Sequence, residues 1–356
     1  MKDLIDKFVC VRLVKANRLD LTLFQFDYDL TFAVFFMNAD KTIYGRYGTR
    51  SSVEEASKDM SMAGLAKSMS AALYLHERYP DIRKLLVGKQ PAVTKYATPN
   101  DYPSLQGKFN KELDYAGAVT KSCLHCHQVL DAQRQVYRDA GQAIPDKVLF
   151  PHPSPTVLGL GFDPETRATV ATVADGSPAK LSGFQPGDEL LTLDGQAILS
   201  VADIQWVLHH TQPVAELPAR VRRDKQSVRL RIKLPEGWRR KSDIAWRVSS
   251  WPLRQMVTGG IVFQQATEEQ RRELGIDAGG LALVIKHLGL YGPHGAAKRA
   301  GFQKGDVIIA YDGREDHMSR SELLTYGAQN TRPGQKVDVT VLRAGKRLNF
   351  QLPMQK

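Results

Sequence analysis

One short stretch of this sequence has an evident chemical capacity: Cys123-Leu124-His125-Cys126-His127. Two thiols at this spacing can add to the two vinyl groups of haem, and the histidine after the second thiol can become an axial ligand of the iron. Covalent haem c, attached at Cys123 and Cys126 with His127 on the iron, is therefore one interpretation.

Other interpretations of these residues stay open. Cys123 and Cys126 could be a catalytic redox pair, because a neighbouring imidazolium, that of His125 or His127, favours the thiolate. They could hold a metal with His127 and His152, although the spacing is not a recognised zinc pattern. They could also be an inert thiol pair. A haem iron would need a sixth ligand, and the weak candidates are His152, His76, Met62 and Met69.

The element expected to carry the motif is a helix. Leu130, Val136 and Tyr137 indicate that it continues from the second thiol and ends near Gly141. Segment 91–150 offers one clear helix, whereas a cytochrome c domain normally has several. Three cysteines are also too few for a disulfide scaffold, so the compartment must be argued from the motif.

The strongest signal is an internal repeat in the C-terminal half. Ser177–Gly195 matches Gly295–Gly313 at a constant offset, with about half of the positions identical. Each copy predicts a short helix, a Gly-Phe exit, a Gly-Asp turn, an apolar strand and an Asp-Gly hairpin. Around both copies the same order of strands, a helix and a closing hairpin can be read.

This order resembles the bacterial PDZ domain of HtrA-type and site-2 proteases. The resemblance implies that a peptide adds as a strand beside the first strand, and that backbone N–H groups of a glycine-containing loop hold its carboxylate. The loops implied are Leu158-Gly159-Leu160-Gly161 and Gly259-Gly260-Ile261-Val262. The far groove wall would be Ile204 and Leu208 in the first copy and Leu323 and Tyr326 in the second.

Several function classes are disfavoured. The sequence has no Gly-x-Ser-x-Gly, His-Glu-x-x-His or Gly-Asn-Ser-Gly-Gly run, so a protease is not expected. The formal net charge is +11. Its densest part, Arg220–Lys241, alternates basic and apolar residues, which predicts a strand with one solvated face and no nucleic-acid partner. No run of 18 apolar residues exists, so no transmembrane segment is expected.

The first ninety residues predict a hairpin and a helix. Lys7–Val14 reads as a buried strand, with Cys10 either an inert core residue inside it, which is favoured, or a resolving thiol for a redox partner that the sequence lacks. Thr31–Met37 and Thr42–Gly48 form an antiparallel hairpin, and a helix spans about Ser61 to Arg78. This order resembles the second half of a thioredoxin fold, whose first strand, Cys-x-x-Cys turn and long helix would lie upstream of Asp6.

The whole chain resembles a planctomycete-type family in which a thioredoxin-like domain, in some members with selenocysteine, is joined to PDZ domains. We expect the upstream redox half to have been lost at an in-frame UGA codon. With that half restored, the chain would be periplasmic or in the cell envelope; as written, it reads as cytoplasmic. The stretches that carry the resemblance are Phe8–Val14, Leu23–Phe32, Tyr44–Arg50, Ser122–Gln128 and Ser249–Met256.

The predicted fold class is thus α+β multidomain. The expected parts are a partial thioredoxin-like domain (1–90), the Cys-x-x-Cys-His segment (91–150), two PDZ domains of sandwich or barrel type (151–237 and 257–356) and a tryptophan-rich connector (238–256) that packs the copies together. The predicted function is that of a redox-linked protein of the cell envelope, whose PDZ domains bind the C-termini or extended segments of a partner. An enzymatic activity as a thiol or selenol oxidoreductase is one interpretation of its redox part. The alternative is a non-enzymatic scaffold with structural cysteines only.

Overall fold

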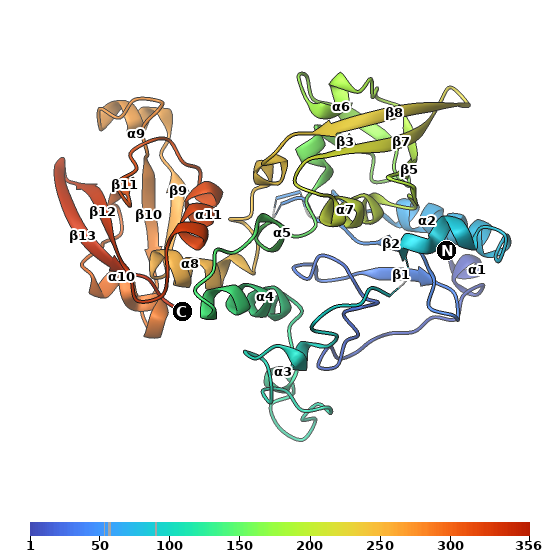
Figure 1. The fold of residues 1–356 in the computed structure, drawn as a ribbon, viewed down its shortest axis with the longest axis horizontal. Helices are drawn as coiled ribbons and strands as arrows, with labels where there is room; N and C mark the ends of the chain where they lie inside the picture. The colour runs from blue at the N-terminus through green and yellow to red at the C-terminus, as the bar shows by residue number, and fades with distance from the viewer. Residues whose placement is uncertain (53, 56–57, 90) are drawn as a thin grey trace. The chain divides into compact units, whose positions relative to one another are not determined.

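The computed structural model describes residues 1–52, 54–55, 58–89 and 91–356 and is drawn in Figure 1. Residue 90, the predicted end of the first segment, lies outside this description. The chain forms two compact units, one made of residues 1–129 and 150–242 and the other of residues 130–149 and 243–356. The division falls inside helix α4 (His127–Asp139). The chain is therefore of mixed α and β type, as predicted.

The N-terminal part of the first unit is a hairpin with a helix packed on it. Strands β1 (Val34–Met37) and β2 (Ile43–Tyr47) pair antiparallel, and α2 (Met62–His76) starts at Ser61, whose hydroxyl accepts the N–H of Gly64. These three elements confirm the predicted hairpin and helix. The other helical turns here are α1 (Lys2–Ile5), η1 (Arg83–Lys89), η2 (Pro99–Asp101) and α3 (Val119–Ser122).

The predicted buried strand Lys7–Val14 was wrong. Residues 9–14 have no regular structure, and the Val9 and Val11 side chains are 94% and 79% exposed. Cys10, predicted to be in the core, is exposed as well. An apolar run becomes a buried strand only where neighbours cover both faces. The hairpin sheet described here contains β1 and β2 alone, and only Phe8 of this run packs on its core.

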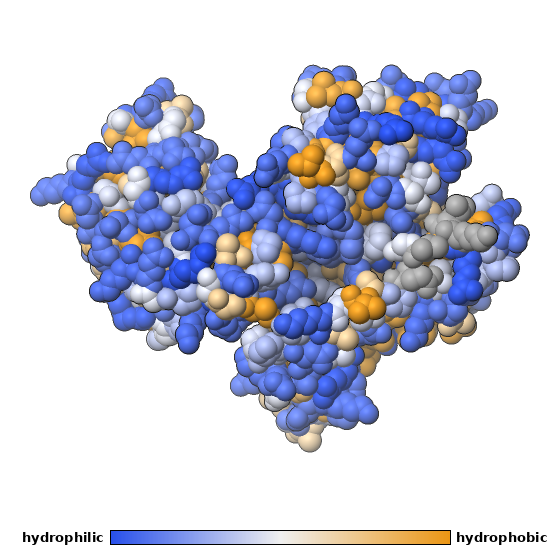
Figure 2. All heavy atoms as spheres, viewed as in Figure 1, coloured by the Kyte–Doolittle hydropathy of each residue, from blue (hydrophilic) through white to orange (hydrophobic). Residues whose placement is uncertain are grey.

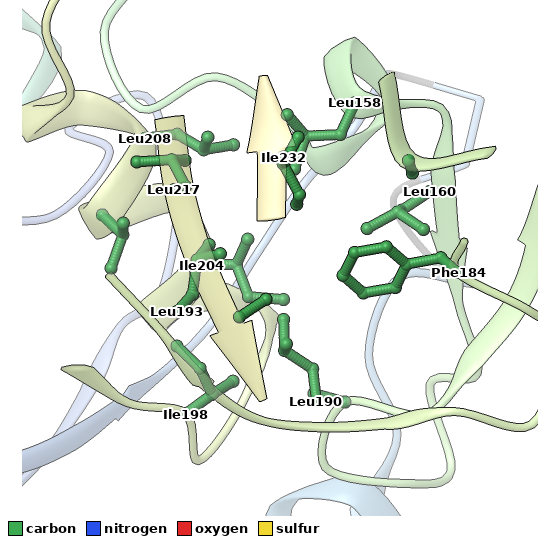
Figure 3. Packing of buried hydrophobic residues seen from close by; sticks show 14 of the residues in the cluster. Leu158, Leu160, Phe184, Leu190, Leu193, Ile198, Ile204, Leu208, Leu217 and Ile232 are labelled. Atoms are coloured by element: carbon green, nitrogen blue, oxygen red, sulfur yellow. The ribbon is translucent and has the colours of Figure 1, made fainter. Parts of the chain in front are cut away.

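The first repeat domain, residues 155–234, has two sheets around one core. Its four-stranded sheet has the order β6-β5-β7-β8, and β3 pairs with β4 in the other. The core is apolar and contains the inward residues of both sheets and of α7 (Figure 3). Its elements are η3 (Pro155–Leu158), β3 (Leu160–Phe162), β4 (Val170–Val173), α6 (Pro178–Leu181), β5 (Glu189–Leu193), β6 (Gln196–Ala197), α7 (Val201–His210), β7 (Ala215–Arg223) and β8 (Gln226–Leu234).

The second repeat domain, residues 261–353, has one five-stranded antiparallel sheet of order β13-β12-β11-β10-β9. Strand β9 therefore lies at a sheet edge, and α11 packs beside it. The elements of this unit are α5 (Asp146–Leu149), α8 (Ser250–Thr258), β9 (Ile261–Gln265), α9 (Glu268–Glu273), β10 (Leu283–Leu288), η5 (Gly292–Gly295), α10 (Ala296–Arg299), β11 (Val307–Tyr311), α11 (Arg320–Asn330), β12 (Lys336–Arg343) and β13 (Lys346–Pro353).

The repeated Gly-Asp turn is explained by a buried ion pair that occurs in both copies. Asp188 accepts the N–H of Gln185 and two hydrogen bonds from the guanidinium of Arg223, at 2.7 and 2.8 Å. Asp306 and Arg343 repeat this geometry with the same distances. Each arginine also donates to the carbonyl of the glycine in the Gly-Phe exit. The repeat is therefore a structural device that joins the turn to the closing hairpin.

The tryptophans of the connector lie in different settings. Trp238, in η4 (Trp238–Lys241), is 1% exposed in the core of the first repeat domain, and its indole N–H donates to the carbonyl of Gln212. Trp238 is therefore part of the core of the first repeat domain. Trp251, on α8, is 42% exposed.

We predict that Asp188→Ala lowers the free energy of unfolding of the chain by about 2 kcal/mol, because the turn loses the buried acceptor of the Gln185 N–H and of two guanidinium hydrogen bonds. Urea denaturation followed by circular dichroism measures the change. The matched control is Asp175→Ala, since the Asp175 side chain is 95% exposed and its pair with Lys180 lies in solvent. Equal effects of the two substitutions would contradict the structural role.

Candidate functional site

The predicted groove wall of the first repeat domain is not open. Leu158, Ile204 and Leu208 have no exposed surface, and Leu160 is 1% exposed. Figure 3 shows these side chains within the core, with Leu208 close to Leu217 and Ile232. The apolar residues that were predicted to line a groove wall instead form the face of α7 that packs in the core.

The glycine loops are placed where they were predicted, but two of their N–H groups are already used. Gly159, with φ of 81°, donates to the carbonyl of Thr156 at 2.9 Å. Gly260, with φ of 89°, donates to the carbonyl of Arg254 at 3.0 Å and so caps α8. These N–H groups, as placed, cannot hold a peptide carboxylate. Gly161 lies in β3 opposite Thr172.

The second repeat domain offers an accessible edge. Ile261 and Leu323 are fully buried in its core, whereas Val262 and Tyr326 are half-buried. The hydroxyl of Tyr326 donates to Asp312 at 2.9 Å. Of the predicted groove residues in this copy, Val262 and Tyr326 are thus the two with exposed surface.

Exposed apolar side chains lie near the start of β9, on the segment that follows β10 and on α8. Leu290 and Tyr291 are 52% and 82% exposed. The rings of Trp251 and His294 are 5.1 Å apart, and the N–H of Gly289 donates to the carbonyl of Gly260. We call Trp251, Leu290 and Tyr291 the apolar patch. Its large exposed side chains can contact apolar groups of a ligand that lies along β9.

A buried charge cluster in the first unit was not foreseen. The ammonium of Lys89 lies 3.1 Å from the Asp203 carboxylate, and both side chains have at most 1% exposure. It also donates to the carbonyl of Tyr44 at 2.8 Å and to that of Ala197. The guanidinium of Arg46 approaches the same carboxylate at 3.6 Å. We call Asp203, Lys89 and Arg46 the ionic lock.

The ionic lock joins the N-terminal hairpin to the outer face of α7. Burial lowers the pKa of Lys89, an effect that the nearby Asp203 carboxylate opposes, and burial lowers the pKa of Arg46 to about 10. The Arg46 guanidinium also lies 4.7 Å from the ring centroid of Trp206. A Cβ on Gly45 would meet Leu199 at 2.7 Å, so only glycine lets β2 approach this closely.

Further contacts complete this interface within the first unit. The hydroxyl of Thr49 donates to Gln205 at 2.7 Å, and the indole N–H of Trp206 donates to Gln25 at 3.1 Å. Ser68 donates to the carbonyl of Leu199 at 2.8 Å. Gln205 and Trp206 are consequently 2% and 8% exposed. A polar residue such as Gln205 on a short helix reads as solvated in the sequence, and no pattern there signals its burial.

The Cys-x-x-Cys-His segment is anchored by one asparagine. Asn17, 2% exposed, donates to the carbonyls of Ser122 and Asn110 and accepts the N–H of Leu124, each at 2.8 Å. Cys123 and Cys126 are free and partly exposed, and His127 begins α4 as the predicted helix requires. Burial, and then the neighbouring Cys123, raise the pKa of Cys126. The thiolate of Cys126 is thereby disfavoured.

The predicted accessory ligands lie in other settings. The ring of His152 stacks on His209 at 4.2 Å, and His76 shares a 2.8 Å hydrogen bond with the hydroxyl of Tyr44. Met69 is in the hairpin core, whereas Met62 is 64% exposed. Within the described ranges, no group of three or more His, Cys, Asp or Glu side chains is arranged to hold a metal ion.

The PDZ domain family matches residues 156–234 and 280–354. The chain therefore contains two PDZ domains, which correspond to the two repeat domains, and the second match begins at residue 280, after β9 and α9. It is 26% identical over 190 residues to the probable periplasmic serine endoprotease DegP-like of Pseudomonas savastanoi pv. phaseolicola, and 27% identical over 190 residues to that of Pseudomonas fluorescens. Each match covers 52% of this chain and 37% of the relative, so the chain spans little more than a third of their length.

A solved structure described as HtrA-type protease AlgW with tripeptide is 24% identical, with a TM-score of 0.23, and the match covers 35% of this chain and 39% of that one. The thioredoxin-like and selenoprotein resemblance finds no counterpart among these matches, so that part remains a prediction. No described helix has both the length and the apolar character to cross a membrane.

We predict that Lys89→Met lowers the free energy of unfolding by about 3 kcal/mol, because it removes the closer of the two cations that compensate a buried carboxylate. Asp203→Asn should cost a similar amount, and the double variant less than the sum, since the two groups interact directly. Urea unfolding of the four chains of this double-mutant cycle measures the coupling. The control Lys15→Met, which removes a partly exposed pair with Glu112, should leave stability unchanged. Additive effects would show that the ionic lock does not join these elements.

Proposed function

We propose that this chain binds extended polypeptide segments through strand addition at β9 of the second repeat domain. The observation that carries the proposal is that β9 is the edge strand of a five-stranded sheet, five residues long, beside α11. An added strand gains main-chain hydrogen bonds along such an edge, and alternate side chains supply specificity.

The first repeat domain is the weaker candidate for this role. Its equivalent strand, β3, has three residues. The outer face of α7 is also covered by the N-terminal hairpin, as the burial of Gln205 and Trp206 demonstrates. Fewer main-chain hydrogen bonds are available along the shorter edge. We therefore propose that this domain supports the N-terminal part and does not bind peptides.

The apolar patch suggests which segments would bind. Trp251, Leu290 and Tyr291 expose apolar surface beside the glycine loop that precedes β9. A partner segment with a large apolar side chain at or near its C-terminus could bury that side chain there, which contributes about 2 kcal/mol. Because the Gly260 N–H already caps α8, we propose that the apolar side chain, rather than the carboxylate, dominates recognition.

The proposed compartment is the periplasm, since the similar proteins are named periplasmic. The endoprotease activity in their names is not extended to this chain, which matches little more than a third of their length. A partner polypeptide in the cell envelope is the corresponding proposal for the ligand.

We predict that fluorescent ten-residue peptides with an apolar C-terminal residue bind the full chain, as measured by fluorescence anisotropy. Gln265→Pro, which removes a backbone N–H that points away from β10, should weaken binding about tenfold or more. The corresponding change Phe162→Pro in β3, whose N–H points away from β4, should leave the affinity within about twofold.

A peptide-side test does not depend on how the variants fold. Peptides N-methylated at alternate residues lose the hydrogen bonds that strand addition needs. Unchanged affinity of the N-methylated peptides for the wild-type chain would rule out strand addition. A C-terminal amide should bind as well as the acid if the apolar side chain dominates, and a large loss with the amide would restore the carboxylate mode.

The second proposal concerns Cys123, Cys126 and His127. Two free, partly exposed thiols and the first residue of α4 lie on one anchored segment, so the residues that would attach haem are present together. Bound haem would supply one-electron transfer. The raised pKa of Cys126 makes thiol–disulfide exchange the less supported chemistry. If neither occurs, the chain is a non-enzymatic scaffold.

We predict a covalent mass gain of one haem and a Soret band when the chain is exported together with haem-attachment machinery. Cys123→Ala should abolish both signals, whereas Cys10→Ala should leave both intact because Cys10 is exposed elsewhere. A colourless protein whose three thiols all alkylate would contradict haem attachment and favour the scaffold.

A further inference from the structure

An array of exposed cations covers one face of the first repeat domain. Strands β7 and β8 form a hairpin in which alternate residues face solvent. The paired positions Arg220 and Arg229 face each other across it, with Arg231 opposite Pro218 in the adjacent register. We call the following exposed residues the basic face: Arg220, Arg222, Arg229, Arg231 and Lys233.

The protein itself neutralises only part of the basic face. Arg231 pairs with Glu216 at 2.9 Å, and Arg222 pairs with Glu189, which also binds Arg167. Arg220, Arg229 and Lys233 have no ion pair among the described residues. Like charges directly opposite each other destabilise an antiparallel pair. The facing pair Arg220 and Arg229 therefore lowers the stability of the fold. A bound anion would relieve this repulsion.

The second repeat domain shows that this fold does not need the cations. The buried pairs Asp188–Arg223 and Asp306–Arg343 fix the alignment of the two hairpins. In that alignment Thr340 and Asn349 replace Arg220 and Arg229, and they join through a 2.8 Å hydrogen bond.

The next pair differs in the same way. Asp338 and Gln351 replace Pro218 and Arg231 and are also hydrogen-bonded to each other. The same register is thus built from neutral and acidic residues in one copy and from arginines in the other. The second copy keeps the exposed cations Lys336 and Arg347 at other positions of this face, so what the first repeat domain alone carries is the facing pair of arginines.

We propose that the basic face docks the chain on a surface of anionic phospholipid headgroups. The cations form two neighbouring rows, with about 5 Å between strands and about 7 Å between alternate residues of one strand. A planar array of phosphates can contact all of them together, whereas a single extended chain follows one row. Four of the five are arginines, whose planar fork binds phosphate with two hydrogen bonds.

The composition of the face disfavours single-stranded nucleic acid. Strands β7 and β8 contain no aromatic side chain on which a base could stack. Figure 2 shows mostly hydrophilic side chains where these strands lie, with apolar side chains beside them. The proposed docking is electrostatic and lies at the level of the headgroups.

Vesicle co-sedimentation with the full chain tests this proposal. We expect binding to mixed phosphatidylcholine and phosphatidylglycerol vesicles, none to pure phosphatidylcholine, and loss of binding as salt shortens the Debye length. The variant R220Q/R229Q should bind roughly 30-fold more weakly. The matched control K336Q/R347Q removes two exposed cations from the second repeat domain and should retain wild-type binding.

Three results would overturn the proposal. Equal losses in the two double variants would show that net charge, not the basic face, attracts the vesicles. Equal binding to neutral vesicles would remove the electrostatic basis. Binding of poly-glutamate or of DNA that is tighter than vesicle binding at the same salt concentration would assign the face to an acidic polypeptide or a nucleic acid. Circular dichroism melts verify that both double variants are folded.

Discussion

The first unit depends on one buried carboxylate. Asp203 is completely enclosed, and the ammonium of Lys89 and the guanidinium of Arg46 reach it from η1 and β2 of the N-terminal part. Burying three ionisable groups is costly unless they compensate one another. Here each cation also donates to a backbone carbonyl, which holds the N-terminal hairpin against α7. The N-terminal part and the first repeat domain consequently form one folding unit.

This constraint gives the two PDZ domains different roles. One uses its helix to hold the N-terminal part and carries charge on an outer sheet face. The other keeps an edge strand of five residues, with exposed Trp251 and Tyr291 near its start. The duplicated core, with its two buried aspartate–arginine pairs, is common to both. The surfaces around this common core differ. The first repeat domain packs against the N-terminal part and carries facing arginines, whereas the second has an edge strand with apolar side chains near its start.

The sequence predicted an element correctly where its residue pattern, and the element on which it packs or with which it pairs, lie close together in the chain. The repeat, its hairpins, the β1–β2 hairpin and the helices α2 and α4 all follow from periodicity and turn residues. The prediction of a strand at Lys7–Val14 and of a buried Cys10 was wrong because burial needs neighbours that local sequence does not specify. Ile204 and Leu208 were assigned to the groove because core and groove positions share one apolar spacing. The ionic lock was missed because Lys89 and Asp203 lie far apart in sequence.

Native-state hydrogen exchange tests the central claim most directly, since it reports which segments open together. If the ionic lock makes one unit, peptides from β2 and α7 should exchange at the same slow rate in the wild-type chain, and both should accelerate together in Lys89→Met. Rapid exchange of residues 43–47 while residues 201–210 stay protected in the wild-type chain would contradict the account, because the hairpin would then open independently of the first repeat domain.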